Sequence, residues 1–240
     1  MIDKRGQITI FIIVAILLVT VTVLFFVFKD SLGFGQSSLD PETEKVFLFV
    51  QDCTRRTFKD SLYNIGQRGG YYTPQTLINS NGVPYYIYKG KVYYPTLENV
   101  SKEIESYVDA NIDYCLGEFK DFPQYNISKG KENSKVNIKE KEIDLEMNYP
   151  ITIHRVEEKT DIETFKVNAY SRLKEMHDFA GKIIGNYSTD GLCLSCIQEI
   201  SEKQNFKVEI SNDNEGITIG IIDQTPKAEN YEFKFGIYNG

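Results

Sequence analysis

The chain has 240 residues, of which 41% are hydrophobic and 25% charged, and its net charge is −7. An acidic chain of this kind lacks the positive surface that nucleic-acid binding requires, so we expect no nucleic-acid partner. Tyr and Phe are abundant, at 16 and 15 residues, and Trp is absent, a composition typical of aromatic-rich sheets.

The first element in chain order is an apolar segment. The 19 residues from Ile10 to Phe28 carry no charge. As a helix that rises about 1.5 Å per residue, this segment with its flanking Ile8 reaches roughly 30 Å, the thickness of the hydrocarbon core of a bilayer. The pattern therefore predicts a transmembrane helix over residues 7–28, followed by a linker with Gly and Ser over residues 29–39.

The charges that flank the apolar segment predict its orientation. Lys4 and Arg5 precede it, whereas Lys29 and Asp30 cancel each other after it. Because the more basic flank stays in the cytoplasm, we expect a short cytoplasmic N-terminus and residues 29–240 outside the cell membrane. The alternative is a cleaved secretory signal. The apolar run exceeds the usual h-region of about 7 to 15 residues, which favours a retained helix.

The residues just before the apolar segment carry a resemblance. Lys4-Arg5-Gly6-Gln7-Ile8-Thr9 resembles the class III signal peptide of archaeal type IV pilin-like proteins. The resemblance implies that a prepilin-type peptidase cuts between Gly6 and Gln7, removes residues 1–6 and leaves the apolar helix in the lipid bilayer. Many pilins have Glu at the fifth mature position, where it is thought to pair with a neighbouring subunit, and this chain has Phe11 there. The alternative is a plain signal anchor.

The next part of the chain, up to residue 123, is expected to form two helices around aromatic strands. Asp40 followed by Pro41 indicates a helix start, because Asp caps free N–H groups and Pro needs none at the first helical position. Val50-Gln-Asp-Cys53 and Ile65-Gly-Gln-Arg-Gly-Gly-Tyr71 resemble segments of membrane-anchored proteins of small archaea, a likeness that implies no activity. The tyrosines predict a sheet face, with an aromatic binding groove as the alternative. The expected elements are a helix over residues 41–65, a strand over 71–78, a hairpin of 83–88 and 91–94, and a helix over 97–119 that Thr96 caps.

Two cysteines lie on the apolar stripes of these two helices. Cys53 recurs at helical spacing with the apolar residues of the first helix, and Cys115 with those of the second. If the helices pack by these faces, the two α-carbons come within disulfide distance, about 5.5 to 6 Å. We therefore expect a Cys53–Cys115 bridge in a domain outside the reducing cytoplasm. The alternative is two buried reduced cysteines that pack as small apolar residues.

The second half of the chain changes its pattern several times. Residues 120–135 are polar and rich in turn residues, so we expect a surface connection there. Alternating apolar and polar residues then predict strands with one buried face, and Pro150 predicts that the second of these is an edge strand or bends into two. The expected elements are strands over residues 136–138 and 143–153, helices over 165–187 and 191–203, and three antiparallel strands over 206–210, 217–222 and 231–237.

Cys193-Leu-Ser-Cys196 has the spacing of a reactive cysteine pair. At a helix N-terminus the dipole favours the first thiolate, which is the basis of thioredoxin-like exchange. No strand directly precedes the pair, and neither His154 nor His177 pairs with a second His at metal spacing. The pattern therefore favours a structural disulfide or a buried pair, with redox exchange and a metal site as the alternatives. We expect no metal, no cofactor and no catalytic residues.

Three sequons, at Asn99, Asn126 and Asn186, offer acceptors for N-glycosylation in an exterior domain. Asn126 lies in the polar connection and is the first candidate. Asn99 falls in the first turn of a helix and Asn186 near the end of another, so both rank behind it.

The expected fold class is α+β. The transmembrane helix is followed by an extracytoplasmic domain over residues 40–240, made of antiparallel strands packed with amphipathic helices and divisible into subdomains over 40–123 and 134–240. The expected function is that of a non-enzymatic surface or envelope interaction module that binds an envelope protein. The alternatives are a membrane-tethered thiol-disulfide oxidoreductase that uses Cys193 and Cys196, and a type IV pilus-like filament subunit.

Overall fold

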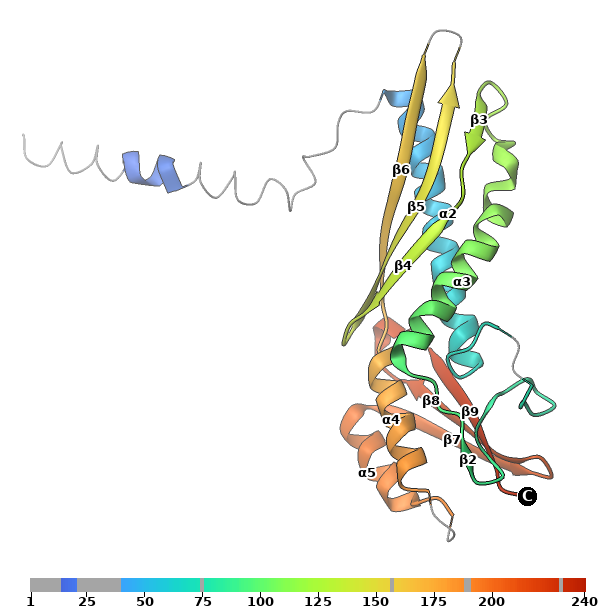
Figure 1. The fold of residues 1–240 in the computed structure, drawn as a ribbon. Coiled ribbons are helices and arrows are strands. Elements are labelled where there is room, and N and C mark those ends of the chain that lie inside the picture. The colour runs from blue at the N-terminus through green and yellow to red at the C-terminus, as the bar shows by residue number, and fades with distance from the viewer. Residues whose placement is uncertain (1–13, 21–39, 74–75, 156–157, 188–190, 229–230) are drawn as a thin grey trace, which may run out of the picture. The chain divides into compact units, whose positions relative to one another are not determined.

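The α+β class is confirmed by the computed structural model (Figure 1). The structure describes residues 14–20, 40–73, 76–155, 158–187, 191–228 and 231–240. Two compact units, Met1–Glu44 and Lys45–Gly240, divide the chain.

In the first unit, residues 14–20 form a helix, and the Thr20 hydroxyl donates to the carbonyl oxygen of Ile16 at 2.6 Å. The expected leader with Gly6 and Gln7, the rest of the expected transmembrane helix and the linker over residues 29–39 lie outside the described residues. Within the described ranges, no helix combines the length and the apolar character needed to cross a membrane.

Helix α2 (Pro41–Gln67) begins as predicted, because Asp40 Oδ1 accepts hydrogen bonds from the backbone N–H groups of Glu42 and Thr43 at 3.1 and 3.2 Å. It ends at two glycines with positive φ, Gly69 and Gly70. A Cβ at Gly69 would lie 2.7 Å from the carbonyl oxygen of Lys234. Only Gly therefore allows the chain after α2 to approach the strand that contains Lys234 so closely. The fully buried apolar residues of α2 are Val46, Val50, Cys53, Phe58 and Ile65.

Helix α3 (Leu97–Leu116) also matches its prediction. Thr96 caps it by accepting from Asn99 N, and Gly117 ends it in the left-handed conformation with φ 53°. The buried stripe recurs every fourth residue, as the apolar pattern indicates. The residues after the helix, Gly117–Phe119, form a 3₁₀ turn. The stripe comprises Val100, Ile104, Val108, Ile112 and Leu116.

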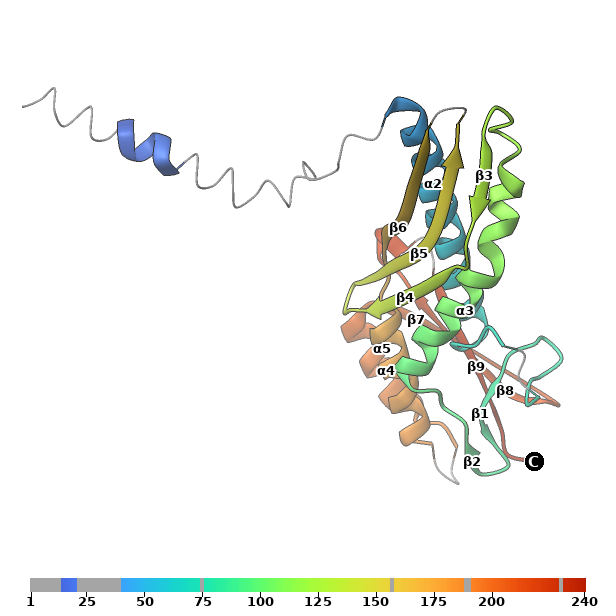
Figure 2. The same cartoon turned by 45° about the horizontal axis from the view of Figure 1, so that its top comes forward.

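One sheet is built around a long central strand (Figures 1 and 2). Strand β5 (Glu142–His154) pairs with β6 (Lys159–Tyr170) on one side and with β4 (Asn133–Ile138) and β3 (Asn126–Lys129) on the other, all antiparallel. One face of β5 is buried and the other is not, as the alternation predicts. The expectation that residues 120–135 are only a connection was wrong, because β3 and the start of β4 lie within them.

Pro150 lies inside β5 without ending it. Strand β4 pairs with β5 as far as Asn148, β3 takes over from Ile151, and the register of β6 shifts between the same two residues. The missing N–H of Pro150 therefore falls where the pairing is interrupted on both sides. The expectation of an edge strand or of two strands was wrong, because the sheet accommodates the Pro by an irregularity in register.

Acidic side chains of α3 cover the free edge of β4. The backbone N–H of Val136 donates to Glu105 Oε1 at 2.9 Å, and that of Ser134 donates to Asp109 Oδ2 at 3.4 Å. These two acids lie one helical turn apart, so they meet alternate residues of the strand. The helix thus occupies donors that another strand would otherwise bind.

A second sheet joins strands from the two halves of the chain, which are β1 (Tyr85–Tyr88), β2 (Lys91–Val92), β7 (Phe206–Asp213), β8 (Gly216–Asp223) and β9 (Glu232–Tyr238). Their order in the sheet is β2-β1-β9-β8-β7. Most neighbours are antiparallel, but β1 and β9 are parallel, which corrects the expectation of antiparallel strands throughout. The parallel pair joins strands from the first and last parts of the chain, so both expected subdomains contribute to this sheet.

The helix expected over residues 165–187 was wrong at its start. Residues 165–170 belong to β6, where buried Phe165 and Val167 pair with residues of β5, and α4 (Leu173–Gly185) follows. Helix α5 (Leu194–Gln204) agrees with its prediction. Both helices lie beside the second sheet in Figures 1 and 2.

The strand expected over residues 71–78 was also wrong. Its described part contains only an isolated bridge between Ile78 and Pro84. The backbone N–H groups of Tyr72 and Thr73 donate instead to Glu103 Oε2, at 2.9 and 2.7 Å. A carboxylate from α3 therefore takes the place of a neighbouring strand.

Candidate functional sites

The expected Cys53–Cys115 disulfide is present and joins α2 to α3. The two α-carbons lie 5.6 Å apart, within the range that the packed helices were predicted to reach. Cys53 is fully buried. Cys115 is only half-buried, because Leu116 continues the buried stripe of α3 at this turn. The prediction that Cys115 itself lies on that stripe was therefore wrong by one residue.

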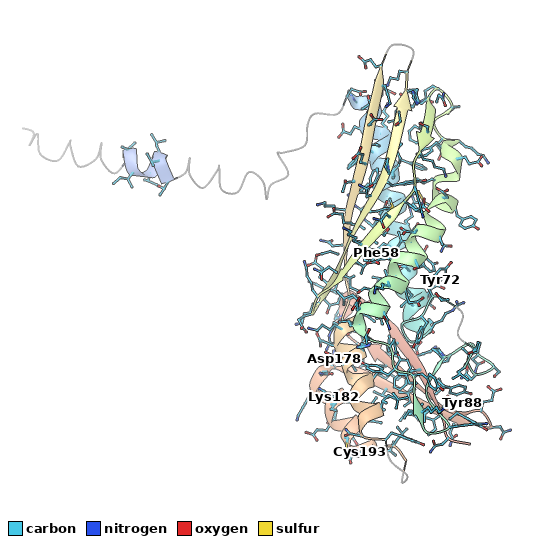
Figure 3. The ribbon with its side chains drawn as sticks, in the orientation of Figure 1. Phe58, Tyr72, Tyr88, Asp178, Lys182 and Cys193 are labelled. Atoms are coloured by element: carbon cyan, nitrogen blue, oxygen red, sulfur yellow. A yellow bond between two sulfur atoms is a disulfide. The ribbon has the colours of Figure 1, made fainter. Side chains whose placement is uncertain are left out.

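Cys193 and Cys196 form the second disulfide, at the start of α5, with their α-carbons 5.3 Å apart. Both cysteines contact a small depression that is also lined by the C-terminal half of α4, where Lys182 lies (Figure 3). The volume of this depression is about 10 Å³, hardly enough for one water molecule. The disulfide therefore packs against α4 instead of lining a cavity for a small substrate.

The position of Cys193 and Cys196 at the start of α5 gives them one property of thiol-disulfide exchange sites, a thiolate that is favoured by a helix N-terminus. Cys193 is the residue that precedes α5, so the free N–H groups of that helix would favour its thiolate after reduction. Among the described residues that line the depression, Lys182 is the only charged one.

The two histidines lie on different parts of the structure. His177 is buried in α4, where its Nε2 lies 2.8 Å from the carbonyl oxygen of Pro95. His154 ends β5, with its Nε2 3.3 Å from Ser128 Oγ. In the part of the chain that the structure describes, no three His, Cys, Asp or Glu side chains gather in a way that could hold a metal ion.

All three sequon asparagines are exposed. Asn126 is the first residue of β3, so it lies at the start of a strand instead of in a loop. Asn99 lies in the first turn of α3, as expected, and Asn186 follows the last residue of α4. The hydroxyl residue of the last sequon, Ser188, lies outside the described residues.

A basic cavity of about 440 Å³, which the sequence did not predict, lies between α2, the end of β6 and the segment before β9. Arg55 and Lys59 lie one turn apart on α2 and contribute two of its cations, and Lys227 contributes the third. The spacing of Arg55 and Lys59 was a signal for a basic stripe on α2, but nothing in the sequence places Lys227 beside it. The described lining residues are Arg55, Lys59, Leu62, Tyr63, Asn168, Ala169, Tyr170, Ser171, Lys227 and Tyr231.

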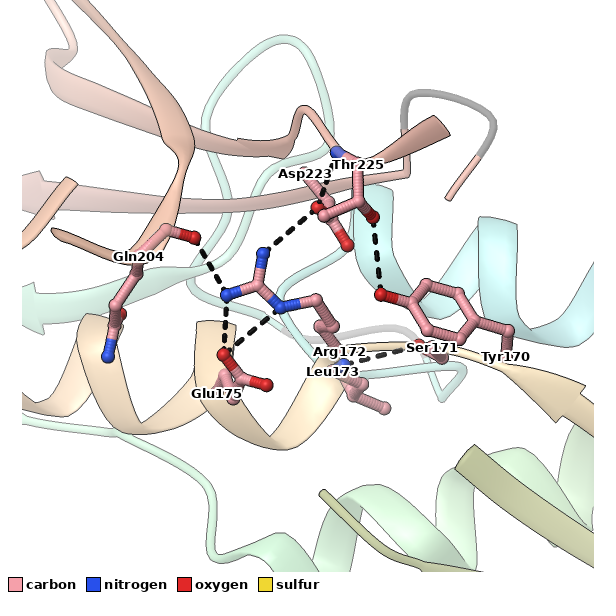
Figure 4. A network of polar contacts seen from close by, with 8 residues as sticks. All are labelled: Tyr170, Ser171, Arg172, Leu173, Glu175, Gln204, Asp223 and Thr225. Carbon is pink, nitrogen blue, oxygen red and sulfur yellow. Dashed lines mark hydrogen bonds and ion pairs between the residues drawn. The ribbon is translucent and has the colours of Figure 1, made fainter. Parts of the chain in front are cut away.

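A buried polar network lies next to this cavity (Figure 4). Arg172 donates to Asp223 Oδ1 at 3.1 Å and to the carbonyl oxygen of Gln204 at 2.8 Å, and its guanidinium also pairs with Glu175. The side chain of Arg172 is 7% exposed and that of Asp223 is fully buried. The network joins the start of α4 to β8 and to the end of α5.

We compared the chain with models of known protein families, with curated proteins and with solved structures, and none of them matched it.

Proposed function

We propose that the chain is a single-pass membrane protein whose residues 40–240 form an extracytoplasmic interaction module of the cell envelope. The observation that carries the proposal is that all four cysteines are joined in disulfides. Disulfides persist in oxidising compartments outside the cytoplasm. The same side of the membrane follows from the basic flank of the apolar segment, Lys4 and Arg5.

Protease treatment of intact cells tests this placement. We expect an external protease to remove residues 40–240 while the apolar segment stays in the membrane after a carbonate wash. A cytoplasmic protein from the same cells should remain intact and serves as the control. Full protection of the chain in intact cells, or its release by carbonate, would contradict the proposal.

The resemblance of the leader to pilin-like proteins adds a test of processing. N-terminal sequencing and intact mass should show a chain that begins at Gln7, and Gly6→Leu should leave the leader attached. Gly33→Leu, which makes the same change outside the leader, should be processed normally. If the chain is a filament subunit, pili that contain it should disappear with Gly6→Leu.

A membrane-tethered thiol-disulfide oxidoreductase is the second candidate. It is favoured by the position of Cys193 before the N-terminus of α5. After reduction by a dithiol, the Cys193 thiolate would attack a substrate disulfide, and Cys196 would then release the reduced substrate and restore the 193–196 disulfide.

Reduction of insulin by the full chain with a dithiol present tests this candidate. The double variant Cys193→Ser, Cys196→Ser should lose the activity, whereas Cys53→Ala, Cys115→Ala should keep it. Equal rates for the wild type and the first variant would remove the enzyme from consideration.

A further inference from the structure

We propose that the basic cavity between α2, β6 and the segment before β9 binds an anionic saccharide, a sugar that carries carboxylate or sulfate groups. This inference rests on the proposed function, because it names a partner for the envelope module. Three of the ten described lining residues of the cavity are cations and none is an acid, although the whole chain carries a net charge of −7.

Two of the three cations of the cavity, Lys59 and Lys227, have no acidic partner among the described residues. The third cation, Arg55, forms an ion pair with Asp52 at 3.7 Å, although Asp52 pairs more closely with the neighbouring Arg56. Among the described residues, no carboxylate lies within ion-pair distance of Lys59 or Lys227. Clustered cations repel one another, so a cavity in which two of three cations lack an acidic partner favours an anionic ligand that would neutralise them.

The remaining walls suit a sugar ring. Tyr63 is 61% exposed, which leaves a flat apolar ring surface open to the C–H face of a saccharide. Tyr170 also lines the cavity, with the ammonium of Lys227 5.9 Å from the centre of its ring. The Asn168 amide offers both donors and an acceptor to hydroxyl groups. Aromatic rings, an amide and cations together match the mixed chemistry of an acidic sugar.

The walls are held in place before any ligand arrives. The hydroxyl groups of Tyr170 and Thr225 lie 3.2 Å apart, and Thr225 N donates to Asp223 Oδ1 at 2.9 Å. Asp223 in turn pairs with the buried Arg172, next to the cavity (Figure 4). The end of β6 and the segment that carries Lys227 are thus connected through a buried network. A preorganised wall reduces the ordering entropy that binding must offset.

The size and lining of the cavity argue against other anions. A volume of about 440 Å³ lies within the range of small-ligand sites, roughly 300 to 1,000 Å³, and far exceeds a single phosphate. Leu62 and Ala169 are the only aliphatic residues among its described lining, which is little surface for an acyl chain. An oligosaccharide with acidic groups fits both the volume and the polar walls.

Calorimetric titration of the purified full chain in a neutral detergent tests this inference. The probes are trigalacturonate, sulfated maltotriose, unmodified maltotriose and inorganic phosphate. We expect one or both acidic sugars to bind and to weaken as salt is raised, because binding neutralises clustered cations. The double variant Lys59→Gln, Lys227→Gln should bind at least tenfold more weakly, with an unchanged unfolding temperature. Which acidic sugar binds will tell a carboxylate ligand from a sulfate ligand.

The matched control is Lys102→Gln, Lys203→Gln, which removes two exposed lysines from α3 and α5 and should bind as the wild type does. The inference is overturned if neither acidic sugar binds, if maltotriose or phosphate binds as tightly as they do, or if the cavity variant binds normally. Binding to anionic lipid vesicles without binding to the sugars would overturn it in favour of a membrane surface. These outcomes are independent of protease access in cells, so this inference and the proposed function can fail separately.

Discussion

The regions around the two sheets are stabilised by different chemistry. Beside the first sheet, α2 is joined to α3 by a disulfide that bridges residues 62 positions apart. Beside the second sheet, the disulfide spans only three positions, so segments far apart in the sequence are joined there by noncovalent contacts. The buried Arg172 network is one such contact, and it joins the start of α4 to β8 and to the end of α5. A disulfide in one region and a buried charge network in the other both hold distant segments together, but reduction should disrupt the first and loss of a charge the second.

Removal of the charge at Arg172 should give the largest loss of stability. In Arg172→Met, the fully buried Asp223 loses its cation, and breaking a buried pair in this way costs about 3 to 5 kcal/mol. For a domain of this size, that is a decrease in Tm of roughly 10 °C. Thermal unfolding of the full chain, followed by circular dichroism, measures it. Lys174→Met, which removes a neighbouring, partly exposed cation of α4 whose partner Glu140 lies at the surface, should change Tm by only a degree or two.

The α2–α3 disulfide should come second. A closed loop of this length stabilises by about 4 kcal/mol in the chain-entropy model, and measured values are typically about 2 to 4 kcal/mol. We therefore expect Cys53→Ala, Cys115→Ala to lower Tm by several degrees, and a reductant to have no further effect at this site. A loss smaller than that of the Cys193→Ala, Cys196→Ala variant would contradict the contrast between the two regions.

The sequence predicted the parts of the fold that depend on local signals. Asp40 and Thr96 cap their helices as expected, because a cap is a matter of a few neighbouring residues. The Cys53–Cys115 bridge followed from two helical stripes, each readable by itself. Even there the period of α3 left Cys115 at the border of the stripe, since Leu116 is the buried residue.

Pairings between distant segments could not be predicted in the same way. Phe165 fits a helical stripe that extends back from α4, and only its pairing with β5 makes it part of a strand. The parallel pairing of β1 with β9 depends on how both ends of the domain pack. The basic cavity combines α2 with Lys227, so no single stretch of sequence carries its pattern.

The Cys193–Cys196 disulfide should contribute less to stability than the α2–α3 disulfide. A ring closed over so few residues removes little freedom from the unfolded chain, so we expect Cys193→Ser, Cys196→Ser to lose no more than about 2 kcal/mol. Low concentrations of dithiol should reduce this half-exposed pair before the bridge that contains the buried Cys53. Alkylation followed by mass spectrometry gives the order. Simultaneous reduction of both pairs would remove the distinction between them.

The smallest effect concerns pH and the packing of α4. His177 Nε2 donates to the Pro95 carbonyl, because a carbonyl can only accept, and Nδ1 lies 2.7 Å from the Tyr94 hydroxyl. Burial lowers the pKa of His177 below its ordinary value, and the Pro95 carbonyl and Asp178 offset this only in part. The ring of Phe233 in β9 also faces the imidazole, at 6.5 Å between ring centres, and adds no charge.

A lowered pKa means that the unfolded chain takes up a proton at His177 before the folded chain does. The stability that depends on the neutral ring is therefore complete above about pH 6.5, the value for an unperturbed His, and decreases as pH falls below it. Urea unfolding of the full chain at several pH values between 5 and 7 should show this decrease in the wild type. His177→Gln should weaken the dependence whatever its absolute stability, while His154→Gln, a change of the other histidine, should retain it. If His177→Gln follows the wild-type slope, His177 is not the group that links the packing of α4 to pH.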